Sequence, residues 1–180
     1  MTVDLTQFHA AFFEESFEAL DAMEAALLKL DVGSPEPELI NTIFRVAPGA
    51  TEGTLFTNAR QLSGIDGLTF MDGVLYANSV TTDTIWRIPV DATGKAGNPV
   101  NIWTDAPLKG PDGMRAVSGH IFVAENQHGQ DSMLTITGDT AHVTVLQTGL
   151  KTPTALDPAG DVLWVGDRAA DNAMTIPMPH

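Results

Sequence analysis

The residues of this chain that could do chemistry are mostly carboxylates that stand at turns between short apolar runs. Asp66 and Asp112 each precede a glycine, and the aspartate of such a pair commonly bonds nearby backbone amides and forms a turn. Thr154 occupies the third equivalent position and offers no carboxylate. A second polar group lacks a fixed ligand spacing, so we interpret it as solvated loop residues rather than a metal site: Glu125, Asn126, His128 and Asp131.

Composition excludes several kinds of site and partner. The chain has no cysteine, and therefore no disulfide, thiolate zinc site or cysteine nucleophile. Its formal net charge is -14 and it carries no basic stripe, so neither nucleic acid nor an anionic membrane is expected as a partner. No apolar run reaches membrane-spanning length and the N-terminus has no basic signal region, which together predict a cytoplasmic protein.

The first 47 residues have a helical period. Apolar residues recur at steps of four and three between positions 5 and 30, which predicts one long amphipathic helix. Ser34-Pro35-Glu36 is typical of a helix start, and Pro48-Gly49 of a stop. A second helix is therefore predicted between them, with an inner face of Leu39, Ile40, Ile43, Phe44 and Ala47.

The amino-acid sequence of this region is more specific than its hydrophobic periodicity. FHAAFFEESFEALDAMEAALLKLD and PELINTIFRVA resemble the first two helices of the phosphotransfer domain of chemotaxis histidine kinases. In that family the second helix continues into a segment whose histidine accepts a phosphoryl group. Here the matching position is Pro48, and Gly49-Ala50-Thr51 follow without a lysine. The resemblance covers residues 1–47 and implies that phosphotransfer has been lost.

From about residue 52 the pattern changes to short β-type runs separated by Gly, Asp and Pro. Positions 66, 112 and 154 begin three similar repeats, spaced 46 and 42 residues apart, which is typical of one propeller blade per repeat. Strands are predicted in the first repeat at 74–77, 84–88 and 100–103, in the second at 120–123, 132–136 and 141–146, and in the third at 162–165 and 173–176.

The repeats also resemble a known family. SGIDGLTF, LYANSVTTDTIWRIPVD, KGPDGM and TPTALDPAGDVLWVGD are similar to the C-terminal half of the six-bladed senescence-marker and gluconolactonase propellers, which include regucalcin. The resemblance implies one divalent cation, calcium, magnesium, manganese or zinc, in a central channel. It makes Asp112 both a metal ligand and the general base, and Asp66 a second ligand where the family has Asn. The turn-forming interpretation of both residues stays open.

These observations predict an α+β fold with a truncated helical hairpin at 1–47, a junction at 48–60 and half a β-propeller at 61–180. The expected function is that of a hybrid, non-catalytic scaffold. One alternative is a divalent-metal-dependent lactone or ester hydrolase completed by dimerisation, and another is a chemotaxis-type adaptor without the phosphoacceptor histidine. Uncovered strand edges predict a homo-oligomer. A small-molecule ligand is a further expectation.

Overall fold

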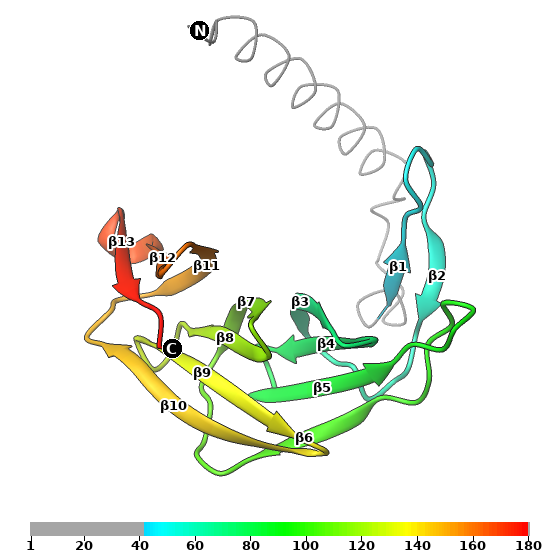
Figure 1. The fold of residues 1–180 in the computed structure, drawn as a ribbon, viewed down its shortest axis with the longest axis horizontal. Coiled ribbons are helices and arrows are strands. Elements are labelled where there is room, and N and C mark those ends of the chain that lie inside the picture. The colour runs from blue at the N-terminus through cyan, green and yellow to red at the C-terminus, as the bar shows by residue number, and fades with distance from the viewer. Residues whose placement is uncertain (1–41, 180) are drawn as a thin grey trace, which may run out of the picture.

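The computed structural model describes residues 42–179, and strands make up most of this range. A hairpin comes first, formed by β1 (Ile43–Arg45) and β2 (Thr54–Thr57). Three consecutive antiparallel meanders follow, which we call the first, second and third blades. Figure 1 shows them side by side in an arc, with the hairpin next to the first blade and the third blade at the far end.

The blades repeat the same order of strands. The first blade contains β3 (Ile65–Met71), β4 (Val74–Ser79), β5 (Thr84–Pro89) and β6 (Val100–Thr104). The second contains β7 (Pro111–Val117), β8 (His120–Glu125), β9 (Gln130–Thr137) and β10 (Thr140–Thr148). The third contains β11 (Pro153–Ala159), β12 (Val162–Asp167), the short 3-10 turn η2 (Arg168–Ala170) and β13 (Asn172–Pro177). The strand positions predicted from the sequence repeats are confirmed.

A recurring polar bond fixes the start of every blade. In each blade the side chain of the last residue of the second strand bonds the backbone of the residue two positions before the inner strand. In the first blade Ser79 Oγ donates to Ser63 O at 2.5 Å. In the other two a carboxylate accepts instead: Glu125 Oε2 from the Lys109 N–H at 2.9 Å, and Asp167 Oδ2 from the Lys151 N–H at 2.7 Å. The next residue donates its N–H to the following carbonyl, in Val80 to Gly64, Asn126 to Gly110 and Arg168 to Thr152. These bonds recur at the sequence spacings of 46 and 42 residues, so the repeat in the sequence is a repeat of backbone geometry.

The first two blades join into one eight-stranded sheet. Their outer strands β6 and β10 pair in parallel at Trp103 and Thr140. Their inner strands β3 and β7, the two ends of the sheet, lie against each other, and the Ala116 N–H donates to Thr69 Oγ1 at 2.8 Å. The sheet therefore nearly closes on itself, in a barrel-like way, and brings the starts of the two inner strands together.

Apolar layers lie between neighbouring blades. Side chains such as Ile85, Ile102 and Met114 fill the layer between the first and second blades, while Phe122, Leu156 and Val165 lie in the layer between the second and third. A third cluster packs the β1–β2 hairpin on the free side of the first blade, through Ile43, Leu62, Ala77 and Ile88. Burial of these faces is the main force that holds the blades in order.

The predicted α+β class is wrong for the described residues. Within 42–179 there is no α-helix, and Ile43 and Phe44, assigned to the inner face of a second helix, lie in strand β1. Phe44 pairs across the hairpin with Leu55, and Ile43 packs under the first blade. This cross-strand pairing and burial outweigh the local helical pattern. The expected turn at Pro48-Gly49 is present, but it connects two strands.

The predicted long helix at 5–30, and most of the segment assigned to the second helix, lie outside the described residues. In the part of the chain that is described, no helix has the length and hydrophobicity needed to cross a membrane.

Candidate functional site

Asp66 and Asp112 occupy the same place in their blades, at the start of the inner strand. In all three blades the pairing between inner and second strand shifts register at this place, between Ile65 and Leu68, Pro111 and Met114, and Pro153 and Ala155. An extra residue at such a bulge redirects the side chains beside it. The bulges on β3 and β7 therefore carry Asp66 and Asp112 out of the regular in-and-out alternation.

The glycines after these aspartates allow the inner strands to approach. A Cβ atom on Gly67 would lie 2.5 Å from the carbonyl oxygen of Asp112, and one on Gly113 would lie 2.5 Å from that of Thr154. Both distances are far below van der Waals contact. The Asp-Gly pairs thus serve the packing of neighbouring blades, which is a broader role than the local turn predicted from the sequence.

Asn78 joins the two inner strands, and sequence reasoning missed it. Its side chain is fully buried. Its Oδ1 accepts a hydrogen bond from the Gly67 N–H at 2.6 Å, and its Nδ2 donates a short hydrogen bond to the Asp112 carbonyl. The second and third blades have Ala124 and Gly166 at the matching strand position. An amide that interrupts this series of small residues was the signal available in the sequence.

The two carboxyl groups meet at this junction. Burial, then a side-chain hydrogen bond to Asp112 and repulsion from its charge, raise the pKa of Asp66 to about 6. Two neighbouring carboxyl groups repel each other when both are ionised, so Asp66 keeps its proton to a higher pH than an isolated aspartate does. A divalent cation placed between them would replace that proton and remove the repulsion.

Asn126 is a third polar side chain at this junction. Its Nδ2 donates to Asp112 Oδ2 at 2.9 Å, so it orients the Asp112 carboxylate through its nitrogen. The carboxylate oxygens of Asp66 and Asp112 are of the kind that calcium, magnesium or manganese prefer. Over residues 42–179, however, no group of three or more His, Cys, Asp or Glu side chains is arranged to hold a metal ion.

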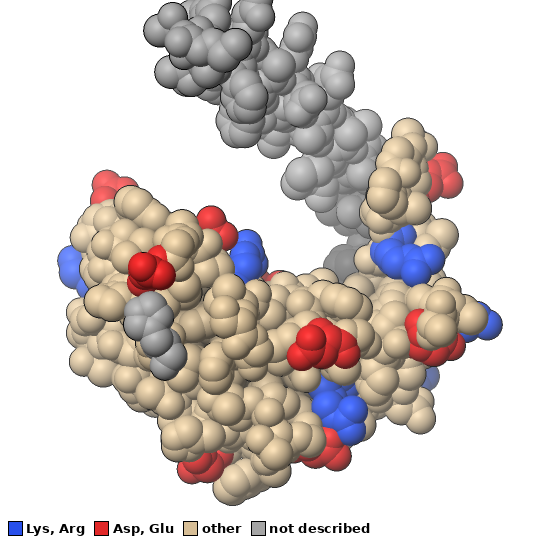
Figure 2. Space-filling view, viewed as in Figure 1, with Lys and Arg blue, Asp and Glu red and all other residues tan. Residues whose placement is uncertain are grey.

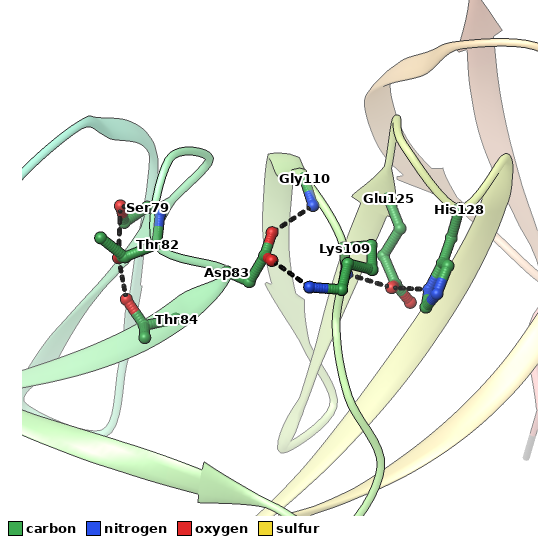
Figure 3. A network of polar contacts seen from close by, with 8 residues as sticks. All are labelled: Ser79, Thr82, Asp83, Thr84, Lys109, Gly110, Glu125 and His128. Atoms are coloured by element: carbon green, nitrogen blue, oxygen red, sulfur yellow. Dashed lines mark hydrogen bonds and ion pairs between the residues drawn. The ribbon is translucent and has the colours of Figure 1, made fainter.

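A second polar network lies at the same end of the blades, and its centre is buried. Figure 3 shows Glu125 beside His128, with Lys109 and Asp83 next to them. Glu125 accepts hydrogen bonds from Ser132 Oγ at 2.5 Å, Gln130 Nε2 at 2.8 Å and the Lys109 N–H at 2.9 Å, and pairs with His128 Nδ1 at 2.8 Å. All the hydrogen-bonding capacity of the Glu125 carboxylate is used inside the second blade. This carboxylate is therefore structural, and the expectation that it is a solvated loop residue is wrong.

Asp83 extends this network across the blades. It belongs to the β4–β5 turn of the first blade and accepts from the Gly110 N–H at 2.8 Å and from Lys109 Nζ at 2.5 Å, both at the start of the second blade. These two bonds connect the second blade to the first, close to the strand that carries Asp112.

Asp131 was also expected to be solvated, and it is fully buried. Neither of its carboxylate oxygens has a hydrogen-bond partner. Burial, together with the nearby charges of Glu125 and Asp167, raises the pKa of Asp131 to about 7. The matching residue of the first blade is the buried Ile85, so an ionisable group stands where the repeat otherwise places an aliphatic one.

Comparison with known proteins gives one sequence relative. A stretch of 47 residues, 26% of this chain, is 45% identical to the chemotaxis protein CheA of Klebsiella aerogenes and covers 7% of that protein. No protein-family model matches the chain.

Comparison with solved structures identifies the fold of the β region. Virginiamycin B lyase from Staphylococcus aureus superposes with a TM-score of 0.59 at 16% identity over 79% of this chain. Regucalcin from Agrobacterium tumefaciens, a calcium-binding protein, gives 0.58 at 20% over 75%, and luciferin-regenerating enzyme 0.56 at 17% over 69%. The β region is part of a propeller. This chain spans only 46%, 51% and 43% of the three structures, respectively, and identities at this level establish the fold alone.

Proposed function

We propose that this chain is a non-catalytic propeller segment that holds a divalent cation weakly at Asp66 and Asp112. The observation that carries the proposal is the meeting of the two carboxyl groups at adjacent inner strands, where Asp112 helps to raise the pKa of Asp66 to about 6. The similarity to a calcium-binding regucalcin in fold supports the choice of calcium as the first cation to test.

The cation would be bound by the Asp66 and Asp112 carboxylates, and the Asn126 Nδ2, bonded to Asp112 Oδ2 at 2.9 Å, would orient the Asp112 carboxylate. Asn78 acts as a positioning residue, because it fixes the backbone of Gly67 and Asp112 on either side of the site. Few protein oxygens converge here, so water would complete the coordination shell. We expect a calcium Kd of about 10⁻⁴ to 10⁻³ M, the range of sites with few charged ligands.

Calorimetric titration with calcium tests the site directly. Asp112→Asn should abolish binding, while the matched control Asp161→Asn, an exposed position in the β11–β12 turn, should leave it unchanged. Binding should be tighter at about pH 7.5 than at about pH 5.5, because the proton on Asp66 competes with the cation below its pKa. Equal heats for the wild type and Asp112→Asn would end the proposal, as would submicromolar affinity.

One alternative retains catalysis. The raised pKa of Asp66 puts a group that can exchange a proton near neutral pH beside Asp112, as a general acid or base requires. A metal-dependent hydrolase would need further ligands, which a second copy of the chain could bring. Opening of a small lactone with calcium, manganese or zinc present, lost in Asp112→Asn and proportional to the dimer fraction seen by light scattering, would favour this alternative over the non-catalytic segment.

A further inference from the structure

An apolar groove lies on the free side of the first blade, the side that faces away from the second blade. It is bounded by strand β3 and the β1–β2 hairpin and encloses about 340 Å³. Its apolar lining includes Phe44, Phe56, Leu68, Phe70, Leu75 and Val90. Phe70 pairs with Leu75 on the sheet, so the floor of the groove continues the apolar face on which the hairpin packs.

The groove has aromatic side chains open to solvent. Phe44 is 53% exposed and Phe70 is 58% exposed, and Leu68 beside them is 40% exposed. Contiguous apolar surface of this kind usually marks a place where another chain segment binds. The free side of the third blade differs, because its exposed Trp164 pairs with Asp157 and Thr175. The groove is therefore a feature of the first blade and not of every terminal blade.

We propose that the apolar stripe of residues 5–30 of the same chain binds in this groove. The stripe carries side chains of the kind the groove would bury, at Phe13, Phe17, Leu20, Met23 and Leu27. The stripe is also joined to the chain close to the groove. Residues 1–41 join the described chain just before Ile43, which itself lines the groove, so the two partners are tethered at high effective concentration.

Charge favours the chain's own segment over a second copy. Residues 1–41 contain nine acidic residues and one lysine. Arg45 lines the groove, and with Lys95 it lines the adjoining hollow at the foot of the hairpin; Figure 2 shows basic side chains where the hairpin meets the first blade. Two whole chains, each with a net charge of -14, repel each other at long range.

Thiol labelling of the full chain tests the proposal, because the natural sequence has no cysteine. Phe70→Cys places a single probe in the groove, and Leu68→Cys is a second probe in case the first variant is unstable. Val145→Cys, exposed on β10, is the reference. We expect the groove probe to react with a maleimide at least about tenfold more slowly than the reference, which corresponds to a groove covered about nine-tenths of the time.

A change in the stripe must then restore reactivity. Phe17→Glu combined with Leu20→Glu should return the groove probe to the reference rate. The matched pair Ala22→Glu and Ala25→Glu adds the same charge off the stripe and should not. Equal rates for probe and reference in the natural background would overturn the proposal, and so would protection that survives the stripe change. Protection that appears only as protein concentration rises would assign the groove to a second copy and overturn it as well.

Discussion

Replacement of Asp131 by asparagine should make the protein less sensitive to pH. The natural carboxyl is fully buried and both its oxygens lack partners. Its pKa of about 7 in the folded state compares with 3.8 for the free side chain. Between these values the folded protein keeps a proton that the unfolded chain has lost, so folding stability falls as pH rises from about 4 to about 7. Below that window ionisation of Asp131 adds no cost to folding, and above it the full ionisation penalty applies.

The free-energy cost of ionising Asp131 in the folded protein follows from the shift of its pKa. A difference of about three pH units corresponds to about 4 kcal/mol. A domain of this size has a total stability of about 5 to 15 kcal/mol, so one carboxylate takes up a large part of it. Asp131→Asn removes the ionisation but not the polarity. The gap between variant and wild type should therefore widen in favour of the variant as pH rises.

Urea unfolding followed by tryptophan fluorescence, at about pH 5, 6.5 and 8, measures that gap. The exposed Asp161→Asn serves as the charge-matched control and should track the wild type. Asp131→Ile, which copies the buried Ile85 of the first blade, should be more stable than the wild type at about pH 8. Parallel stability curves for the wild type and Asp131→Asn would refute the reasoning, because they would mean that the carboxylate is solvated or paired when the protein is in solution.

Three further outcomes are expected. Gly67→Ala should cost about 1 to 3 kcal/mol in urea unfolding, because its Cβ would meet the Asp112 carbonyl at 2.5 Å; the control Gly166→Ala, whose Cβ would meet only Ala155 at 3.5 Å, should cost much less. Asn78→Ala should lower both stability, by about 1 to 3 kcal/mol, and calcium affinity in calorimetry, because it frees two partly buried backbone groups that position the site; a loss of stability with unchanged affinity would contradict the positioning role. A chemotaxis-type kinase with labelled ATP should leave no acid-labile phosphate on the chain, because Pro48 stands where the phosphoacceptor histidine is expected; labelling of any histidine would count against this.

The sequence predicted the strands well because their signals are local and repeated. Alternation of apolar residues located three blades at spacings of 46 and 42 residues, with Asp-Gly at the start of the first two and Thr154 at the matching position of the third. It also located Asp66 and Asp112, which the structure brings together across two strands. The raised pKa of Asp66 depends on its contact with Asp112 in the next blade, and no single repeat contains both partners.

Two of the predictions made from the sequence were wrong for the same kind of physical reason. Ile43 and Phe44 fit a helical period, but pairing with β2 and burial under the first blade decide their conformation. Asp131 is polar and follows a turn, but its place on β9 directs it into the layer between the second and third blades, against Ala124. In both cases a partner distant in sequence outweighs the local preference.

The polar bonds of this fold divide into two kinds, and the division bears on how such a chain can be rearranged. The bonds of Glu125 to Lys109 and of Asp167 to Lys151 stay within one blade, so a blade can be duplicated, deleted or recombined at these loops with its own bonds intact. Asp83 is different, because its carboxylate binds the backbone and side chain of the following blade. These bonds add a polar contact between the first and second blades to the apolar layer that holds them together. A shuffled gene that separated Asp83 from Lys109 would keep the bonds within each blade and lose this contact between the first and second blades.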